Sequence, residues 1–200
     1  MAEGRERLLD SAEELFDRYG IDGVSTRAIT QAAGHRNNAA IHYHFGSRAE
    51  LVEAVLTRYR TDVDQHRHRL LDELEAKGTP SLEGVVRALY VPLVDLLEQP
   101  SGRRHLRLMS QAATHPSFVS RVDLRVASSI VRAGMLLLAQ LPDLHGRVLE
   151  QRMYTLVAMS LSTLGRQAWL IDGEEPGRSP LAPDVLEDEL VRTALGLLRA

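Results

Sequence analysis

The sequence predicts an all-α protein, and three features support that fold class. Apolar residues recur at spacings of three and four along most of the chain, as on the buried face of a helix. No segment shows the two-residue alternation of a half-buried strand. The chain has 200 residues of ordinary globular composition, 44% hydrophobic and 26% charged, which suffices for a sizeable core. We expect a compact amino-terminal unit followed by a larger helical remainder.

The first predicted helix begins near the amino terminus and ends at Gly20. A glycine just past the last periodic residue is a common C-terminal stop. The apolar face, which we expect to be buried, carries Leu8, Leu9, Ala12, Leu15, Phe16 and Tyr19. The opposite face is acidic, and we expect it to be solvated; it carries Glu6, Asp10, Glu13, Glu14 and Asp17.

Three further helices are predicted before the first break in periodicity. Ser25 is placed to cap the helix TRAITQAA. The next helix is expected from about Asn37 to Phe45. Ser47 then opens a longer helix, and Glu50 three residues later completes a capping box. This helix is expected to run unbroken to the segment AKGTPS.

Helical periodicity continues to the carboxy terminus. A loop rich in glycine and proline is expected at 172–183. The remaining helices are predicted over about 82–98, 103–114, 116–141, 143–171 and 184–199.

Composition excludes several classes of protein. The chain has no cysteine, which removes disulfides and thiolate metal sites. The amino terminus carries acids where a signal peptide needs an apolar run, and no apolar stretch approaches the ~20 residues that span a bilayer. We therefore expect a cytoplasmic protein. Its net charge of -3 gives no overall attraction to nucleic acid, so any such attraction must be local.

Catalytic and metal-binding motifs are not found in the sequence. The rings of His66 and His68 would point in different directions on a helix and could not share an ion. The sequence contains no HExxH, no phosphate loop, no dinucleotide-binding turn and no nucleophile elbow. We expect no metal, no cofactor and no enzymatic activity.

The segment GHRNNAAIHYHFGSR, residues 34–48, is rich in hydrogen-bonding groups and contains no acid. Residues 23–49 hold three arginines and no acid, whereas residues 1–60 hold eight basic and nine acidic residues, a net charge of -1. The positive charge is therefore confined to this part of the sequence. Because acids would repel phosphate, the pattern favours a surface that meets DNA.

Short helices separated by a tight turn are typical of a helix-turn-helix, whose second helix enters the major groove. Gly34 can supply the turn, because glycine tolerates the left-handed conformation. Arg27 and Arg36 are placed to reach guanine edges or phosphates.

The third helix presents two contrasting faces on a helical wheel. Ile41 and Phe45 lie four residues apart and are expected to anchor it to the first two helices. His44 lies nearer this inward side, so an internal hydrogen bond and a DNA contact both remain open for it. The opposite face carries Ala39, His42, Tyr43 and Gly46.

The stretch STRAITQAAG…IHYHFGSRAELVEAV resembles the amino-terminal domain of the TetR family of bacterial transcriptional repressors. The resemblance covers about Arg5 to Leu56. It implies a phosphate contact by Thr26 and a base contact by Arg27. It also implies that His42 and Tyr43 touch DNA and that Arg48 clamps a phosphate. The full set of expected DNA-binding residues is Thr26, Arg27, Arg36, Asn37, Asn38, Ala39, His42, Tyr43, His44 and Arg48.

Two departures from the family pattern fall in this segment. His42 stands where the family usually has tyrosine. The stretch from Gly34 to Phe45 is one residue longer than the common pattern, which leaves the alignment of His35, Arg36, Asn37 and Asn38 open. Either asparagine could read adenine or cap the third helix.

The resemblance also implies two domains, a DNA-binding domain over 1–47 and a helical effector-binding and dimerisation domain over 48–200. Polar and aromatic candidates for a small-molecule pocket are Tyr90, His105, Arg107, Gln111, Phe118, Gln140, Tyr154 and Trp169. Candidates for a dimer interface, which form apolar stripes on the last two helices, are Leu156, Met159, Ser160, Thr163, Leu164, Leu186, Leu190, Ala194 and Leu197. The alternative is that these stripes complete the core of a single chain.

The leading hypothesis is a homodimeric repressor that leaves a palindromic operator in double-stranded DNA when a small molecule binds. A second hypothesis is an all-α small-molecule-binding protein or enzyme with a vestigial helix-turn-helix. A third is an activator, or a regulator without a ligand, that keeps the same DNA-binding unit.

Overall fold

The structure of the protein, a computed structural model, describes residues 2–35, 37, 39–113, 128–173 and 177–200. Every regular element in these ranges is helical, so the all-α prediction is confirmed. The elements are α1 (Ala2–Tyr19), α2 (Thr26–Ala32), α3 (Ala39–Phe45), α4 (Arg48–Leu56), α5 (Arg60–Ala76), α6 (Leu82–Asp95), η1 (Leu96–Glu98), α7 (Pro100–Ala113), α9 (Ser128–Leu138), α10 (Gly146–Ile171) and α11 (Pro183–Arg199).

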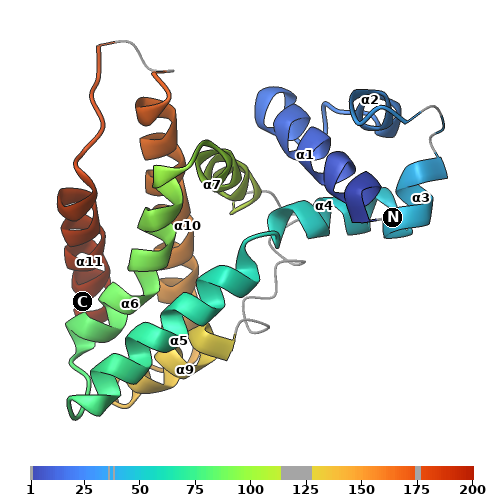
Figure 1. The fold of residues 1–200 in the computed structure, drawn as a ribbon. Coiled ribbons are helices and arrows are strands. Elements are labelled where there is room, and N and C mark those ends of the chain that lie inside the picture. The colour runs from blue at the N-terminus through green and yellow to red at the C-terminus, as the bar shows by residue number, and fades with distance from the viewer. Residues whose placement is uncertain (1, 36, 38, 114–127, 174–176) are drawn as a thin grey trace.

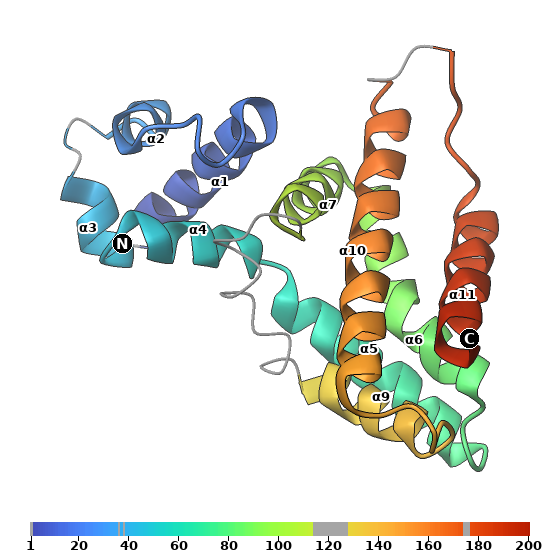
Figure 2. The same cartoon turned by 180° about the vertical axis from the view of Figure 1, so that it is seen from behind.

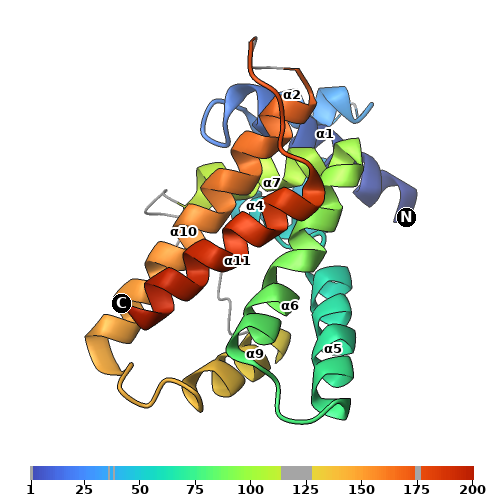
Figure 3. The same cartoon turned by 90° about the vertical axis from the view of Figure 1, so that its left-hand side faces the viewer.

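The helices form a small head and a larger bundle. Figures 1 and 2 show α1 to α4 gathered at one end, with α5, α6, α9, α10 and α11 forming the bundle and α7 between the two parts. Figure 3 shows α10 and α11 side by side, and α11 also packs on α6.

Local sequence signals explain the helix ends in the head. The hydroxyl of Ser25 accepts the amide hydrogen of Ala28 at 3.2 Å, and the hydroxyl of Ser47 accepts that of Glu50 at 3.1 Å. Gly20, which ends α1, has a φ of 75°. The two predicted N-caps and the glycine stop are thus confirmed.

Two hydrophobic cores lie on either side of α7, and α7 contributes to both. Leu106 belongs to the core of the bundle, whereas Leu108 and Ala112 belong to the core of the head. The head core also takes four apolar residues of α4: Leu51, Val52, Val55 and Leu56. The predicted domain boundary after residue 47 remains a prediction, but α4 packs with the head.

The helix predicted to run unbroken from Ser47 is interrupted, so that prediction is wrong. α4 ends at Leu56 and α5 begins at Arg60. Neither glycine nor proline marks the break. The flanking tertiary contacts account for it: Arg58 pairs with Glu13 of α1 at 2.8 Å, and the ring of Tyr59 lies 4.7 Å from that of His105 on α7.

Two side chains of α1 depart from the predicted faces. Tyr19, expected to be buried, is 63% exposed. Glu13, expected to be solvated, is 1% exposed. The reason is that α7 packs against α1 and brings His105 beside Glu13, while Arg58 supplies an opposite charge.

The carboxy-terminal helices follow the prediction closely. α7 begins three residues earlier than expected, at Pro100, where proline suits the first turn because it has no amide hydrogen to leave unpaired. The helix predicted over 116–141 falls partly outside the described residues, and α9 is its later part. None of the described helices is long and apolar enough to cross a membrane.

Candidate nucleic-acid interface

The first turn of α2 presents Thr26 and Arg27 at the surface of the head. Thr26 is half-buried and Arg27 is exposed. Two residues further on, Ile29 is fully buried in the head core and fixes the rotation of the helix. Ile29 therefore holds one side of α2 against α1 and leaves the Arg27 side chain in solvent.

The outer face of α3 carries Ala39, His42 and Tyr43, all exposed, with Tyr43 at 70%. Ile41, only 1% exposed, anchors the helix from the other side as predicted. The Nδ1 atom of His42 lies 2.6 Å from the carbonyl oxygen of Gly46. Since a carbonyl oxygen can only accept, Nδ1 must carry a proton, and a neutral His42 then offers an acceptor at Nε2.

Asn37 is exposed, and its side chain binds the backbone at the start of α3. Its Oδ1 atom accepts the amide hydrogen of Ala39 at 2.9 Å, which is the capping alternative left open by the sequence. The side-chain amide group still has two hydrogens to donate. Arg36 and Asn38, the other two predicted contacts in this turn, lie outside the described residues.

His44 is half-buried and turns towards α1. Its ring packs against the rings of Tyr43, at 4.9 Å, and His35, at 6.2 Å. A Cβ atom on Gly4 would come within 3.3 Å of the Nε2 atom of His44, so glycine permits this approach. This packing favours the internal role over the DNA contact predicted for His44.

Arg48 also points inward in the structure, unlike the outward orientation that a phosphate clamp would need. Its guanidinium donates to the carbonyl oxygen of Ile21 and lies 5.4 Å from the ring centroid of Phe16. The Nη1 atom is buried without a hydrogen-bond partner in the described part of the chain. A cation in the first turn of a helix is disfavoured by the helix dipole, and the Ile21 carbonyl compensates for this.

The charge pattern of the head suits an anionic partner. Residues 23–49 contain no aspartate or glutamate. The acids of the head lie mainly on α1, where Glu6, Asp10 and Glu13 are paired with Arg58. The exposed surface of α2 and α3 is therefore free of negative side chains, as a surface in contact with phosphates should be.

Comparison with known proteins identifies this head. The sequence model of bacterial regulatory proteins of the tetR family matches residues 8–55, a range that includes α2, α3 and most of α1 and α4. The head of the chain therefore matches the TetR family.

Two curated relatives come from Pseudomonas putida. The chain is 28% identical over 110 residues to the HTH-type transcriptional regulator SrpR, a match that covers 54% of this chain and 46% of SrpR. It is also 28% identical over 110 residues to the uncharacterized HTH-type transcriptional regulator TtgW of the same species, covering 54% of this chain and 72% of TtgW. The match thus spans less than half the length of SrpR.

Solved structures share the fold over nearly the whole chain. NalD of Pseudomonas aeruginosa, described as the secondary repressor of the MexAB-OprM multidrug efflux pump, aligns with a TM-score of 0.64 at 21% identity, covering 98% of this chain and 96% of NalD. The TetR-family regulator PfmR of Thermus thermophilus aligns with a TM-score of 0.51 at 21% identity, covering 97% and 98%. At these identities the likeness establishes the fold alone.

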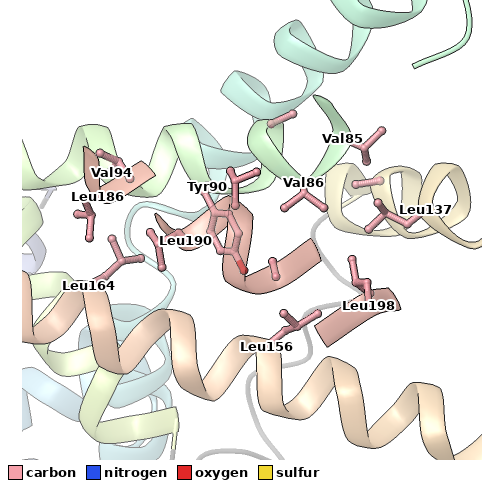
Figure 4. Packing of buried hydrophobic residues seen from close by; sticks show 14 of the residues in the cluster. Val85, Val86, Tyr90, Val94, Leu137, Leu156, Leu164, Leu186, Leu190 and Leu198 are labelled. Carbon is pink, nitrogen blue, oxygen red and sulfur yellow. The ribbon is translucent and has the colours of Figure 1, made fainter. Parts of the chain in front are cut away.

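The residues that the TetR resemblance suggested for an effector pocket are spread over several contacts in the structure, and a pocket built from them stays a prediction. Tyr90 is buried in the bundle core (Figure 4). Its hydroxyl accepts a hydrogen bond from Ser160 at 2.8 Å. His105 lies at the contact with α1. Arg107 binds Asp17 and lies 4.8 Å from the ring centroid of Trp169.

The other pocket candidates are equally scattered. Gln111 and Tyr154 are exposed, on α7 and α10. Phe118 lies outside the described residues. An open cavity of about 410 Å³ near the carboxy terminus is lined by Gln140 but by none of the other candidates; Arg152 and Arg199 also line it. Helical spacing alone could not reveal which face of each helix meets another helix.

Most of the predicted dimer residues are buried within one chain, which favours the alternative that these stripes complete the core of a single chain. The core of the bundle contains Leu156, Leu164, Leu186, Leu190 and Ala194 (Figure 4). Ser160 is 5% exposed, Met159 and Leu197 pack against the core, and Thr163 is half-buried. The physical reason is that α7 packs on α10 and α6 packs on α11. These contacts within the chain bury the apolar stripes of α10 and α11.

Sequence reasoning missed one buried charge, Arg67, which is 6% exposed within α5. It also missed the ion pair that half-buried Arg58 forms with Glu13 at the contact between α1 and α7. The sequence held one signal for Arg67, since it lies four residues from both Val63 and Leu71. Within the described ranges, no group of three histidine or acidic side chains could hold a metal ion.

Proposed function

We propose that this TetR-family protein is a cytoplasmic, homodimeric transcriptional repressor without enzymatic activity. It binds a palindromic operator in double-stranded DNA and leaves it when a small molecule binds the helical bundle. The observation that carries the proposal is the exposed, acid-free face of α2 and α3, where Arg27, His42 and Tyr43 stand in solvent.

The proposed DNA contacts differ slightly from the set suggested by sequence. Arg27 reads a base edge or a phosphate, and Tyr43 and His42 meet the DNA from α3. Small Ala39 lets α3 approach the groove. We leave out His44 and Arg48, because both are engaged inside the head. The rest of the proposed set is Thr26, Arg36, Asn37 and Asn38.

The proposed dimer uses the outer face of α10, opposite its buried stripe. Thr155 and Ala158 are half-buried there, and Ser162 is exposed. Small side chains on a helix face allow a second helix to approach closely, and two copies related by a two-fold axis would form a four-helix bundle with α11. The names of the relatives SrpR and NalD, a regulator and a repressor, support the regulatory role.

Release would follow from a change in the spacing of the two heads. Two α3 helices must lie ~34–36 Å apart to enter successive major grooves. A ligand that binds better to another spacing shifts the population away from the DNA-bound form. Because α4 and α5 are not one continuous helix, we assign the transmission to α7, which packs on both the head and α10.

Selection from a pool of random duplexes, followed by affinity measurements at several salt concentrations, tests the proposal. We expect an enriched inverted repeat whose binding weakens steeply with salt, because counterions are released from DNA on binding. A folded, dimeric protein that enriches no sequence would contradict the proposal. That result would favour a small-molecule-binding protein with a vestigial helix-turn-helix.

A further inference from the structure

A single stripe of α5 faces the interior of the bundle, and a charge lies in its middle. The buried residues of α5 are Val63, Arg67 and Leu71, spaced four apart. Arg67 is 6% exposed, so its guanidinium occupies a position where an aliphatic side chain would complete the core.

This guanidinium has one hydrogen bond in the described part of the chain. Its Nε atom donates to the carbonyl oxygen of Leu89 on α6 at 3.2 Å. Burial lowers the pKa of Arg67 to about 10. The nearest acid on its own helix, Asp64, is committed elsewhere: it accepts hydrogen bonds from the amide of Ser129 at 2.9 Å and the hydroxyl of Ser128 at 3.2 Å.

Arg107 provides a matched comparison within the same molecule. It is also 6% exposed, but it forms ion pairs with the carboxylates of Asp17 and Asp172. Burial alone would lower the pKa of Arg107, but the hydrogen bonds and charges of Asp17 and Asp172 together outweigh it and raise the pKa. Among the described residues, no carboxylate forms an ion pair with the Arg67 guanidinium. A buried charge is costly unless it is paired, so Arg67 lacks the partner that Arg107 has.

We infer that Arg67 is the anchor of an amphipathic organic anion bound within the bundle, with its carboxylate on the guanidinium and its apolar body among the neighbouring leucines. A guanidinium can hold a carboxylate through two parallel hydrogen bonds. The three helices that pack together here, α5, α6 and α9, carry partly buried apolar side chains that could contact the apolar body: Leu70, Leu89, Leu93 and Leu136. The inference names the class of effector and rests on the proposed function for its regulatory meaning.

A purely structural role for Arg67 makes a different prediction. If the bond to Leu89 exists to hold α5 against α6, removing the side chain should destabilise the protein and leave ligand binding untouched. If Arg67 awaits an anion, replacing it with an apolar side chain should preserve or raise the melting temperature, because an unpaired buried charge is removed.

The test uses decanoate and decanol as matched anionic and neutral probes, measured by displacement of the fluorescent anion 8-anilinonaphthalene-1-sulfonate. The variants are Arg67→Met, Arg67→Lys and the control Arg69→Met, which makes the same change at an exposed position two residues away. We expect the unaltered protein to prefer decanoate to decanol. Arg67→Met should weaken decanoate binding by about tenfold to a hundredfold and leave decanol unchanged. Arg67→Lys should lie between the two, and Arg69→Met should match the unaltered protein.

Three results would overturn the inference. The first is an unaltered protein with no preference for decanoate over decanol. The second is unchanged decanoate affinity in Arg67→Met or, if that variant does not fold, in Arg67→Lys. The third is an equal loss in Arg69→Met. None of these measurements involves DNA. Decanoate binding through Arg67 without release of a selected operator would leave the inference standing and remove ligand release from the proposed function.

Discussion

Arg107 on α7 donates to both carboxylate oxygens of Asp17 on α1, and a third guanidinium nitrogen donates to Asp172 at the end of α10. Arg103, one turn earlier on α7, also donates to Asp172, at 2.6 Å. Three segments far apart in the sequence are therefore held together at one point. This point joins the head to the bundle through α7 and supports the route proposed for transmission of the ligand signal.

Replacing Arg107 with methionine should destabilise the protein strongly. The change keeps an apolar side chain of similar length but leaves Asp17, whose side chain is 9% exposed, as a buried charge without its main partner. We expect a loss of about 3 kcal/mol in the free energy of unfolding. Urea denaturation would measure it, with the chain's one tryptophan, Trp169, as a local probe beside Arg107. Arg192→Met at an exposed site is the control, and a loss equal to that control would contradict the assignment.

The inward orientation of Arg48 leads to a prediction opposite to that from the family resemblance. A phosphate clamp replaced by alanine should lower the salt slope of DNA binding by about one. Because Arg48 instead donates to the carbonyl of Ile21, we expect Arg48→Ala to lower the melting temperature and to leave the salt slope unchanged. Affinity for a selected operator, measured at several salt concentrations, distinguishes the two. Arg69→Ala, at an exposed position of α5, serves as the control. A salt slope reduced by about one in Arg48→Ala, but not in the control, would show that Arg48 contacts a phosphate.

His105 should make the contact between α1 and α7 sensitive to acid. Burial, assisted by the charge of Arg58, lowers the pKa of His105 to about 4. In the unfolded chain the histidine has its ordinary pKa of about 6.5, so between this pH and about pH 4 the unfolded chain binds more protons than the folded protein. The stability that neutral His105 contributes is therefore fully present at neutral pH and is lost as the pH falls towards 4. We expect His105 to account for about 2 kcal/mol of lost stability between pH 7.5 and pH 5.

The other charges around His105 require a matched variant. Glu13 faces it with a carboxylate oxygen 4.0 Å from its Nδ1 atom, and burial raises the pKa of that carboxyl. Denaturation of His105→Gln across the same pH range should show a shallower dependence than the unaltered protein. His145→Gln, at an exposed position, is the control. If His105→Gln and the unaltered protein lost stability in parallel, the acid response would come from other groups.

Local signals in the sequence predicted most of the helices and the head. The features that the sequence did not predict depend on contacts between segments far apart in the chain. Ser25, Ser47 and Gly20 act within one turn of their own position, so their roles could be read directly. The burial of Glu13 depends on α7, about ninety residues away, and nothing near Glu13 indicates it.

The dependence on distant segments also explains why the predicted pocket and interface residues are dispersed in the structure. Helical periodicity showed that Leu164 and Leu190 lie on apolar stripes, but the stripe does not identify the helix that covers it. In the structure α7 packs on α10 and α6 packs on α11, so the apolar stripes are buried within a single chain. Of the predicted DNA face, the exposed positions Arg27, His42 and Tyr43 followed from short-range spacing, while the inward turn of Arg48 depended on a carbonyl 27 residues away.

The outer face of α10 carries the last prediction, which concerns assembly. In an interface with two-fold symmetry, residues near the axis meet their own copies. Ala158→Glu would place two like charges there, and we expect it to convert a dimer into a folded monomer with weakened operator binding. Size-exclusion chromatography with light scattering would report the mass, and circular dichroism would show whether the helices persist. Gln65→Glu, which adds the same charge at an exposed position of α5, should remain dimeric. A dimeric Ala158→Glu would exclude this face and direct attention to the exposed apolar residues of α9, Val131, Met135 and Leu138.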